Sequence, residues 1–326
     1  MTLLKKLGSA GAIALAVTAA VPAAAQDPAS CRTVRFADVG WSDIAATTGM
    51  ASVVLEGLGY RPTTTLASVP IAFAGIKNKQ IDAFLGYWNP SMTPMIEPFV
   101  KAGQIKVQDQ PNLVGAKYTL AVNSAAAEGG IKSFADIAKY SKELDGKIYG
   151  IEPGNDGNAL IQRMIDKNEF GLKSFKMVES SEAGMLAEVQ RSARLKKWIV
   201  FLGWEPHPMT TQVKMSYLTG GDSVFGPNIG EAKVYTALAT DYTTRCPNAA
   251  KLIGNMQFNT DMENQVMQLI MDKSNPVVAG RNWLKKNPVV LQKWLAGVTT
   301  FSGTDGLAAV NKAVGLPSST VERVSY

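Results

Sequence analysis

Strand-like and helix-like segments alternate along the first two thirds of this chain, and this alternation narrows the possible folds more than any other feature. Residues 33–40 (TVRFADVG) read as a strand, and a helix-like run of small residues follows, with Ser42 or Asp43 placed to cap its start. The strand–helix–strand pattern repeats over residues 63–88 and over residues 147–204. Strands joined by helices lie parallel in one sheet. We therefore expect an α/β protein with mostly parallel sheets flanked by helices.

Two extended segments interrupt the alternation and predict two lobes. The first covers about residues 105–123, and the second follows the loop LTGGDSVFGPN, from about residue 228. Two such crossings, with a helical last third, are typical of two lobes that close on a cleft by a hinge motion. We expect lobe 1 to comprise residues 26–113 and 228–326 and lobe 2 to comprise residues 114–227, with the ligand cleft between them.

The first 25 residues have the form of a signal peptide. Lys5 and Lys6 precede an apolar run over residues 7–21, and three alanines at residues 23–25 form a cleavage site. Cys31 does not directly follow the apolar run, so we expect a free mature protein and not a lipid-anchored one. No later run of apolar residues is long enough to span a bilayer. These features predict an exported protein.

Charge and cysteine content limit the partners and the redox state. The formal net charge is +6, from 33 basic and 27 acidic side chains. Removal of Lys5 and Lys6 leaves 31 basic side chains against 27 acidic ones, a charge of +4. No arginine-rich run or basic–aromatic alternation is present, so we expect no nucleic-acid partner. In an exported chain Cys31 and Cys246 are expected to form a disulfide, the alternative being two separate buried thiols.

Three of the six tryptophans share one local position, the carboxyl end of a predicted strand. Trp41, Trp88 and Trp204 each follow Gly or Gly-Tyr there, and Trp204 is expected to be exposed just past its strand. Asn155 follows another predicted strand, and Tyr118 lies in the first crossing. This edge of an α/β sheet is where ligands bind. Converging aromatic faces suit a quaternary ammonium group, although sugar stacking and core packing are alternatives.

Acidic side chains border these positions. Asp43, Glu152, Asp156 and Glu205 all lie within three residues of one of them. Each carboxylate alone is more often a helix cap or a solvated turn, but together they favour a cation that has no carboxylate of its own. His207, the one histidine, could donate to a ligand carboxylate or fix the turn through a backbone carbonyl, and we favour the structural role.

Motifs for catalysis are missing from the sequence. It contains no G-x-S-x-G, H-E-x-x-H or C-x-x-C pattern, and its single histidine has no apparent nucleophile or metal-ligand partner. The glycine-rich stretch GIEPGNDGN lacks the lysine of a phosphate-binding loop. We therefore expect a binding protein and not an enzyme, with no catalytic residue, no metal and no cofactor.

Six runs of residues carry a resemblance to a known family: VRFADVGWSD, FLGYWNPSM, LVGAKYTLA, KIYGIEPGNDGN, VESSEAGMLAEV and VFLGWEPHPM. They resemble the glycine betaine and choline substrate-binding family of ABC transporters, and within it the periplasmic choline-binding proteins, over residues 31–316. The resemblance implies a two-lobed type II periplasmic binding protein. It also implies an aromatic box around the trimethylammonium group, made of Trp41, Trp88, Tyr118 and Trp204. Asp43 and Asn155 would contact the cation or the hydroxyl end, with Asp156 and His207 as possible secondary contacts.

The function that the resemblance implies is capture of choline, and more weakly of acetylcholine, for delivery to a membrane ABC permease and its ATPase. We expect a monomer in the periplasm. Glycine betaine or proline betaine is the alternative ligand, against which the acidic fringe argues. An exported enzyme acting on choline derivatives and a ligand-sensing partner of a membrane receptor are alternatives from other classes.

Overall fold

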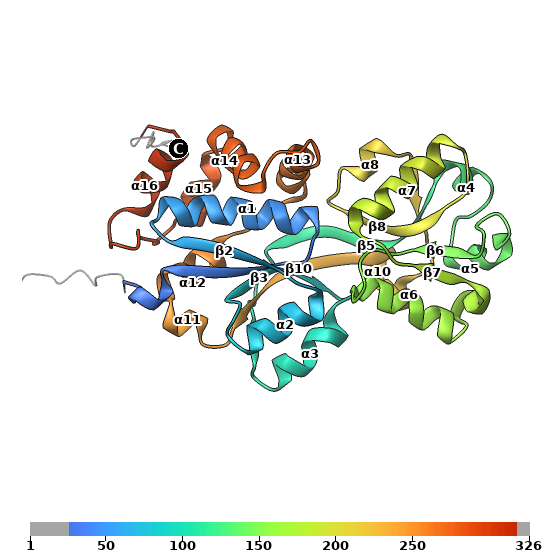
Figure 1. Cartoon of the computed structure of the whole chain (residues 1–326), viewed down its shortest axis with the longest axis horizontal. Helices are drawn as coiled ribbons and strands as arrows, with labels where there is room; N and C mark the ends of the chain where they lie inside the picture. The colour runs from blue at the N-terminus through green and yellow to red at the C-terminus, as the bar shows by residue number, and fades with distance from the viewer. Residues whose placement is uncertain (1–25, 318–326) are drawn as a thin grey trace, which may run out of the picture.

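The computed structural model describes residues 26–317. The predicted signal peptide at residues 1–25 and the last nine residues of predicted lobe 1 lie outside the described residues. Figure 1 shows two groups of elements side by side, which we call lobe 1 (around β1, β2 and β3) and lobe 2 (around β6, β7 and β8). Two long strands, β5 and β10, join them.

The secondary structure follows the predicted alternation. The strands are β1 (Thr33–Asp38), β2 (Arg61–Leu66), β3 (Ala83–Asn89), β4 (Ile105–Val107), β5 (Leu113–Asn123), β6 (Lys147–Tyr149), β7 (Lys176–Val178), β8 (Val200–Glu205), β9 (Met215–Tyr217) and β10 (Glu231–Ala239). The helices up to β9 are α1 (Ser42–Gly57), α2 (Val69–Lys77), α3 (Thr93–Lys101), α4 (Ser124–Glu128), α5 (Phe134–Ile137), α6 (Asp156–Asp166), α7 (Glu182–Arg194) and α8 (Met209–Gln212). The later helices are α9 (Asp222–Phe225), α10 (Pro227–Gly230), α11 (Tyr242–Arg245), α12 (Pro247–Asn255), α13 (Thr260–Met271), α14 (Pro276–Lys286), α15 (Val289–Trp294) and α16 (Gly306–Ala313). Short 3-10 turns cover Ala29–Cys31, Ala138–Tyr140 and Glu169–Ser174.

The strands form a continuous sheet in the order β2-β1-β3-β10-β5-β8-β6-β7, with β4 added on β10 and β9 added on β5. Within lobe 1, β1 is parallel to β2 and β3, and within lobe 2, β6 is parallel to β7 and β8. β5 and β10 are antiparallel to their neighbours and to each other. The predicted α/β class, with parallel strands in each lobe, is confirmed.

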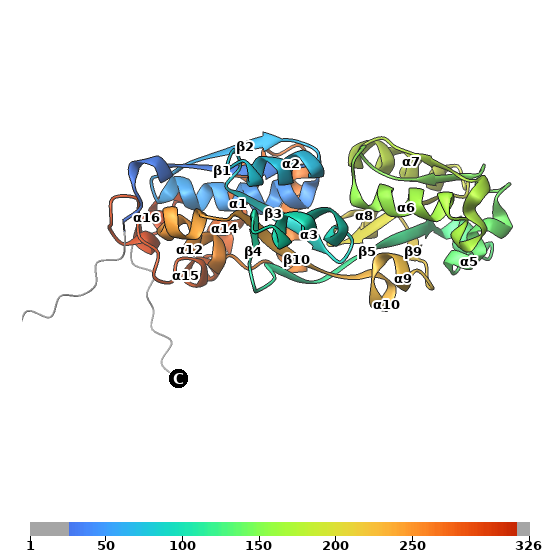
Figure 2. The same ribbon diagram turned by 90° about the horizontal axis from the view of Figure 1, so that it is seen from below.

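Helices cover both lobes. Figures 1 and 2 show α12–α16 with α1 in lobe 1 and α5–α7 at the opposite end of the molecule, in lobe 2. α1 is buried along most of its length because it packs between the sheet and α13, α14 and α16. The crossing of α1 with α14 needs glycine, since a Cβ on Gly49 would lie 2.6 Å from the carbonyl oxygen of Pro276. This packing fixes the position of α1, whose N-terminal end carries part of the site.

The start of the described chain is held by covalent and polar contacts. Cys31 and Cys246 form the predicted disulfide, with Cα atoms 5.6 Å apart and a sequence separation of 215. Asp27 is buried and accepts hydrogen bonds from the backbone amides of Asn248 and Ala249 at the start of α12. These contacts anchor the start of the described chain to the start of α12. Within residues 26–317 no helix is long and apolar enough to cross a membrane.

Two local predictions are wrong. Trp204 is not exposed beyond its strand: it lies inside β8 and its side chain is only 4% exposed. The side chains of Ser42 and Asp43 do not cap α1, because Trp41 is the N-cap residue and makes no side-chain capping bond. The amide of Ser42 instead donates to a carboxylate from lobe 2, that of Glu182. Trp204 is buried because β8 continues through it and pairs with β5, and Ser42 and Asp43 cannot be the N-cap because α1 already begins at Ser42.

Candidate ligand-binding site

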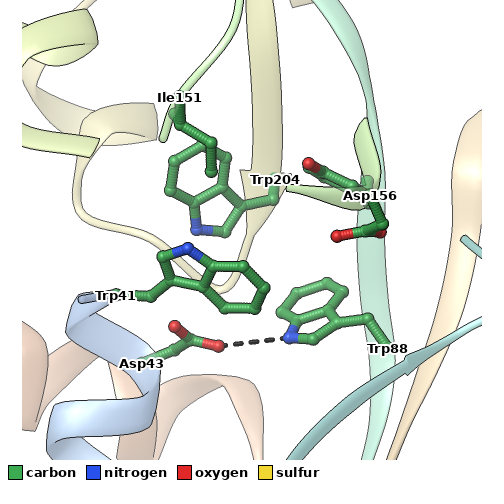
Figure 3. Close-up of a pocket in the computed structure, with 7 residues that line it drawn as sticks. Trp41, Asp43, Trp88, Ile151, Asp156 and Trp204 are labelled. Atoms are coloured by element: carbon green, nitrogen blue, oxygen red, sulfur yellow. Dashed lines mark hydrogen bonds between the residues drawn. The ribbon is translucent and has the colours of Figure 1, made fainter. Parts of the chain in front are cut away.

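A small cavity lies where the two lobes meet (Figure 3). Its empty space is about 270 Å³, including the part open to solvent. It is lined by Trp41, Asp43, Trp88, Tyr118, Ile151, Asp156 and Trp204. Lobe 1 contributes Trp41 and Asp43 at the start of α1 and Trp88 in β3. The other four side chains come from β5, the segment after β6, α6 and β8.

Strand register brings the aromatic rings together. Tyr118 in β5 and Trp204 in β8 are direct partners in an antiparallel pair, and their ring centroids are 6.4 Å apart. Trp88 lies in β3, separated from β5 by β10 in the sheet, and its ring is 5.9 Å from that of Tyr118. Figure 3 shows the indoles of Trp41, Trp88 and Trp204 around one common space. The four predicted box residues therefore lie together, contributed by both lobes.

Three of the four predicted box residues donate a hydrogen bond to a nearby side chain. Trp88 Nε1–H donates to Asp43 Oδ2 at 3.2 Å, and Trp41 Nε1–H donates across the lobes to Glu152 Oε1 at 2.9 Å. Tyr118 Oη–H donates to Asn155 Oδ1 at 3.0 Å. These bonds fix the ring orientations and leave the aromatic faces as the main surface of the cavity.

Two buried carboxylates complete the lining. Asp43 and Asp156 are 3% and 1% exposed, and in the described part of the chain Asp43 Oδ1 and Asp156 Oδ2 have no hydrogen-bond partner. Burial raises the pKa of Asp43 to about 7, with a further contribution from the charge of Glu182. Burial likewise raises the pKa of Asp156 to about 6 and that of Glu152 to about 7. Unpartnered buried carboxylate oxygens are stabilised by a cation, which offsets their loss of hydration.

Asn155 lies beside the cavity and is not among its lining residues. It is the N-cap of α6, and its Oδ1 accepts from the Asn158 amide at 3.0 Å as well as from Tyr118. Its Nδ2 is 3.3 Å from Asp156 Oδ1. Asn155 therefore orients Tyr118 through its Oδ1 and Asp156 through its Nδ2.

His207 is fully buried and holds the turn after β8. Its Nδ1 accepts from the Met209 amide at 2.9 Å, so the predicted bond to a backbone carbonyl is wrong and the backbone partner is a donor. Nε2 therefore carries the proton, and it lies 3.2 Å from Glu182 Oε1. The ring also packs edge-on against Trp204, with centroids 5.0 Å apart. His207 thus packs against Trp204, one of the aromatic residues that line the cavity.

Sequence reasoning missed two residues of this region. Ile151 lines the cavity and comes shortly after the end of β6. Its position near a strand end is a signal that the sequence contains. Glu182 bridges the lobes, but in sequence it looks like an ordinary acidic residue in the first turn of α7. Glu205, which the sequence placed in the acidic fringe, is half-buried and does not line the cavity.

Comparison with known proteins agrees with this geometry. Residues 32–286 match the family described as the substrate binding domain of ABC-type glycine betaine transport systems. An ABC-transporter choline-binding protein solved in complex with choline is 53% identical, with a TM-score of 0.87, covering 89% of this chain and 100% of its own. A structure described as an ABC-transporter choline-binding protein in an unliganded semi-closed conformation is 54% identical, with a TM-score of 0.81, covering 88% and 100%.

A further relative is the uncharacterized protein ORF1 of Chromohalobacter salexigens. It is 48% identical over 147 residues, which are 45% of this chain and 94% of that protein. The family match extends over both lobes and includes every residue that lines the cavity. The chain therefore belongs to the family of substrate-binding domains of ABC-type glycine betaine transport systems.

Proposed function

We propose that this protein captures choline in the cavity between its lobes and delivers it to a membrane ABC permease and its ATPase. The observation that carries the proposal is the lining: four aromatic rings together with two buried carboxylates, each with one unpartnered oxygen. A trimethylammonium group cannot donate a strong hydrogen bond, so ring faces and nearby negative charge are what can recognise it. A well-placed ring contributes about 0.5–2 kcal/mol.

The neighbour in complex with choline supports this choice of ligand. We assign Trp41, Trp88, Tyr118 and Trp204 to the trimethylammonium group. Asp43 Oδ1 is the proposed contact to the cation, and the region of Asn155 and Asp156 is the proposed place of the hydroxyl group, which can donate to Asp156 Oδ2. The carboxylate of a betaine would lie against the same two acids, which favours choline over glycine betaine or proline betaine.

The proposed mechanism is binding followed by closure. Lobe 1 would comprise residues 26–113 and 228–326 and lobe 2 residues 114–227, with the hinge at the two crossings formed by β5 and β10. A ligand that contacts both lobes stabilises the closed form and shifts the population towards it. We further propose that residues 1–25 are removed on export and that the mature protein is a periplasmic monomer. It would bind its ligand without chemical change, as expected for a transport family.

One titration series tests the proposal. Purified mature protein is titrated with choline, acetylcholine, glycine betaine and proline betaine, following the heat of binding and tryptophan fluorescence. We expect choline to bind most tightly and acetylcholine more weakly. Tighter binding of either betaine would refute the proposed specificity. The ligands are then recovered and analysed by mass spectrometry, and any converted product would show that the protein is an enzyme.

A further inference from the structure

A carboxylate from lobe 2 bridges the two lobes beside the cavity. Glu182, the first residue of α7, accepts a hydrogen bond from the backbone amide of Ser42 through Oε2 at 3.0 Å. Its other oxygen, Oε1, is 3.2 Å from His207 Nε2. Ser42 is the first residue of α1 in lobe 1, whereas α7 belongs to lobe 2 (Figure 1). His207 lies between β8 and α8, also in lobe 2. Glu182 is 7% exposed and does not line the cavity.

The donors around Glu182 are fixed. The Met209 amide occupies His207 Nδ1, so Nε2 is the protonated nitrogen and donates to Glu182. The Ser42 amide is one of the N-terminal amides of α1 that have no partner within the helix, and the positive end of the helix dipole favours an anion there. Both oxygens of Glu182 must therefore act as acceptors, and the bond to Ser42 requires the lobes to be in contact.

This bridge is attached to the walls of the cavity on both sides. Ser42 directly follows Trp41, whose indole donates across the lobes to Glu152. His207 packs against Trp204 on the other side. On the surface, Ser42 and Glu182 also border a groove that is open to solvent. Trp41 lines both this groove and the cavity, so Glu182 lies close to the cavity on the side of the groove.

We propose that Glu182, held by His207, is a latch for the closed form. Its carboxylate binds the Ser42 amide when the lobes meet and lengthens the time that a ligand stays bound, without touching the ligand. Glu182 is therefore a positioning residue, and its effect is the same for every ligand that the closed cavity holds. The inference rests on the proposed function of the cavity, but the position of the latch does not depend on which cation is bound.

Two independent variants weaken the latch. Glu182→Gln keeps the shape of the side chain but offers only one acceptor oxygen to two fixed donors, so one of the two bonds is lost, and the neutral amide is attracted less strongly to the positive end of α1. Ser42→Pro removes the amide hydrogen at the first helical position, where proline is tolerated, and Trp41 before it is already extended, as proline requires. Ser42→Ala, which keeps the amide, is the reference for Ser42→Pro. Glu188→Gln, on the same helix and paired with Arg191 on the surface, is the matched control.

Stopped-flow tryptophan fluorescence measures the dissociation of choline and of tetramethylammonium from each protein. We expect both latch variants to speed the dissociation of both ligands by one common factor, roughly tenfold to a hundredfold, the value of a hydrogen bond to a charged group. Association should change less, and Glu188→Gln should behave as the wild type. Unchanged dissociation, or an effect on only one of the two ligands, would overturn the latch.

A measurement without ligand separates this inference from the proposed function. Small-angle X-ray scattering of ligand-free protein should give a larger radius of gyration for Glu182→Gln than for the wild type, because the latch no longer favours contact between the lobes. Equal radii would refute the latch. A wild type that binds neither cation, with an expanded Glu182→Gln variant, would refute the proposed function and leave the latch supported. Thermal unfolding verifies that each variant is folded.

Discussion

Choline binding should weaken at least about a hundredfold when the pH falls from 8 to 5. Burial raises the pKa of Asp43 to about 7 in the ligand-free cavity, and a bound cation favours the ionised carboxylate. Affinity is then fully present above about pH 8 and is lost as the pH falls through 7. At pH 5 about 1% of Asp43 is ionised before binding, so the apparent dissociation constant rises about a hundredfold. Asp156, with a pKa of about 6, raises the apparent dissociation constant by a further factor of up to about ten.

Isothermal titration calorimetry between pH 8 and pH 5 tests this expectation. Each titration is repeated in two buffers with different heats of ionisation, and the difference gives the number of protons released on binding. Choline has no group that titrates in this range, so the protons come from the protein. We expect nearly none at pH 8 and about one or more at pH 5. Asp43→Asn should bind more weakly at pH 8 and release about one proton fewer at pH 5.

A flat affinity between pH 8 and pH 5, with heats that do not depend on the buffer, would refute the reasoning.

The raised pKa of Asp43 also predicts how the folding stability of the ligand-free protein depends on pH. This stability should fall as the pH rises, whereas choline affinity should increase. A carboxyl group with a raised pKa favours the folded state when protonated, so its stabilisation is present below about pH 4 and is lost as the pH rises towards 7. Ligand-free Asp43→Asn should therefore be more stable than the wild type at pH 8, by at most on the order of 4 kcal/mol.

Three further substitutions test the site and the fold. Trp204→Ala should weaken choline binding at least about tenfold and Trp204→Phe much less, because phenylalanine keeps a ring face; equal affinities by calorimetry would exclude Trp204 from the site. Gly157→Ala places a Cβ 2.1 Å from the Tyr118 hydroxyl, so it should displace that ring and weaken choline binding. An affinity equal to that of the wild type would show that the position of Tyr118 is unimportant. Replacing both Cys31 and Cys246 by serine removes a cross-link between residues that are 215 positions apart in sequence. It should lower the free energy of unfolding in urea by about 2–5 kcal/mol, and an unchanged value would contradict a stabilising disulfide.

Much of the fold and most of the cavity lining follow from the sequence. The alternation of periodic segments predicts the strands and helices because side-chain periodicity is a local property. Trp41, Trp88 and Trp204 can be grouped from their positions at strand ends, and the family resemblance adds Tyr118. The disulfide is also predictable, because a chain that is predicted to be exported and has two cysteines allows one intramolecular pairing.

What each chosen side chain does depends on neighbours that the sequence does not show. Trp204 looks exposed in sequence because its strand seems to end before it, but pairing with β5 extends β8 through it and covers the ring. Asn155 looks like a lining residue, yet its amide is held by the start of α6 and by Tyr118. His207 and Glu182 are 25 residues apart in sequence and meet only when α7 packs beside the turn after β8.

The sequence by itself therefore determined the element types, the parallel strands within each lobe and the aromatic and acidic composition of the cavity. The tertiary structure decided which oxygens are left without partners, which ring faces line the cavity, and that Glu182 joins the lobes at Ser42. The physical reason is the distance along the sequence over which each effect acts. Periodicity and strand-end chemistry act over a few neighbouring residues, whereas burial and a contact between lobes depend on sheet order and helix packing across the whole chain.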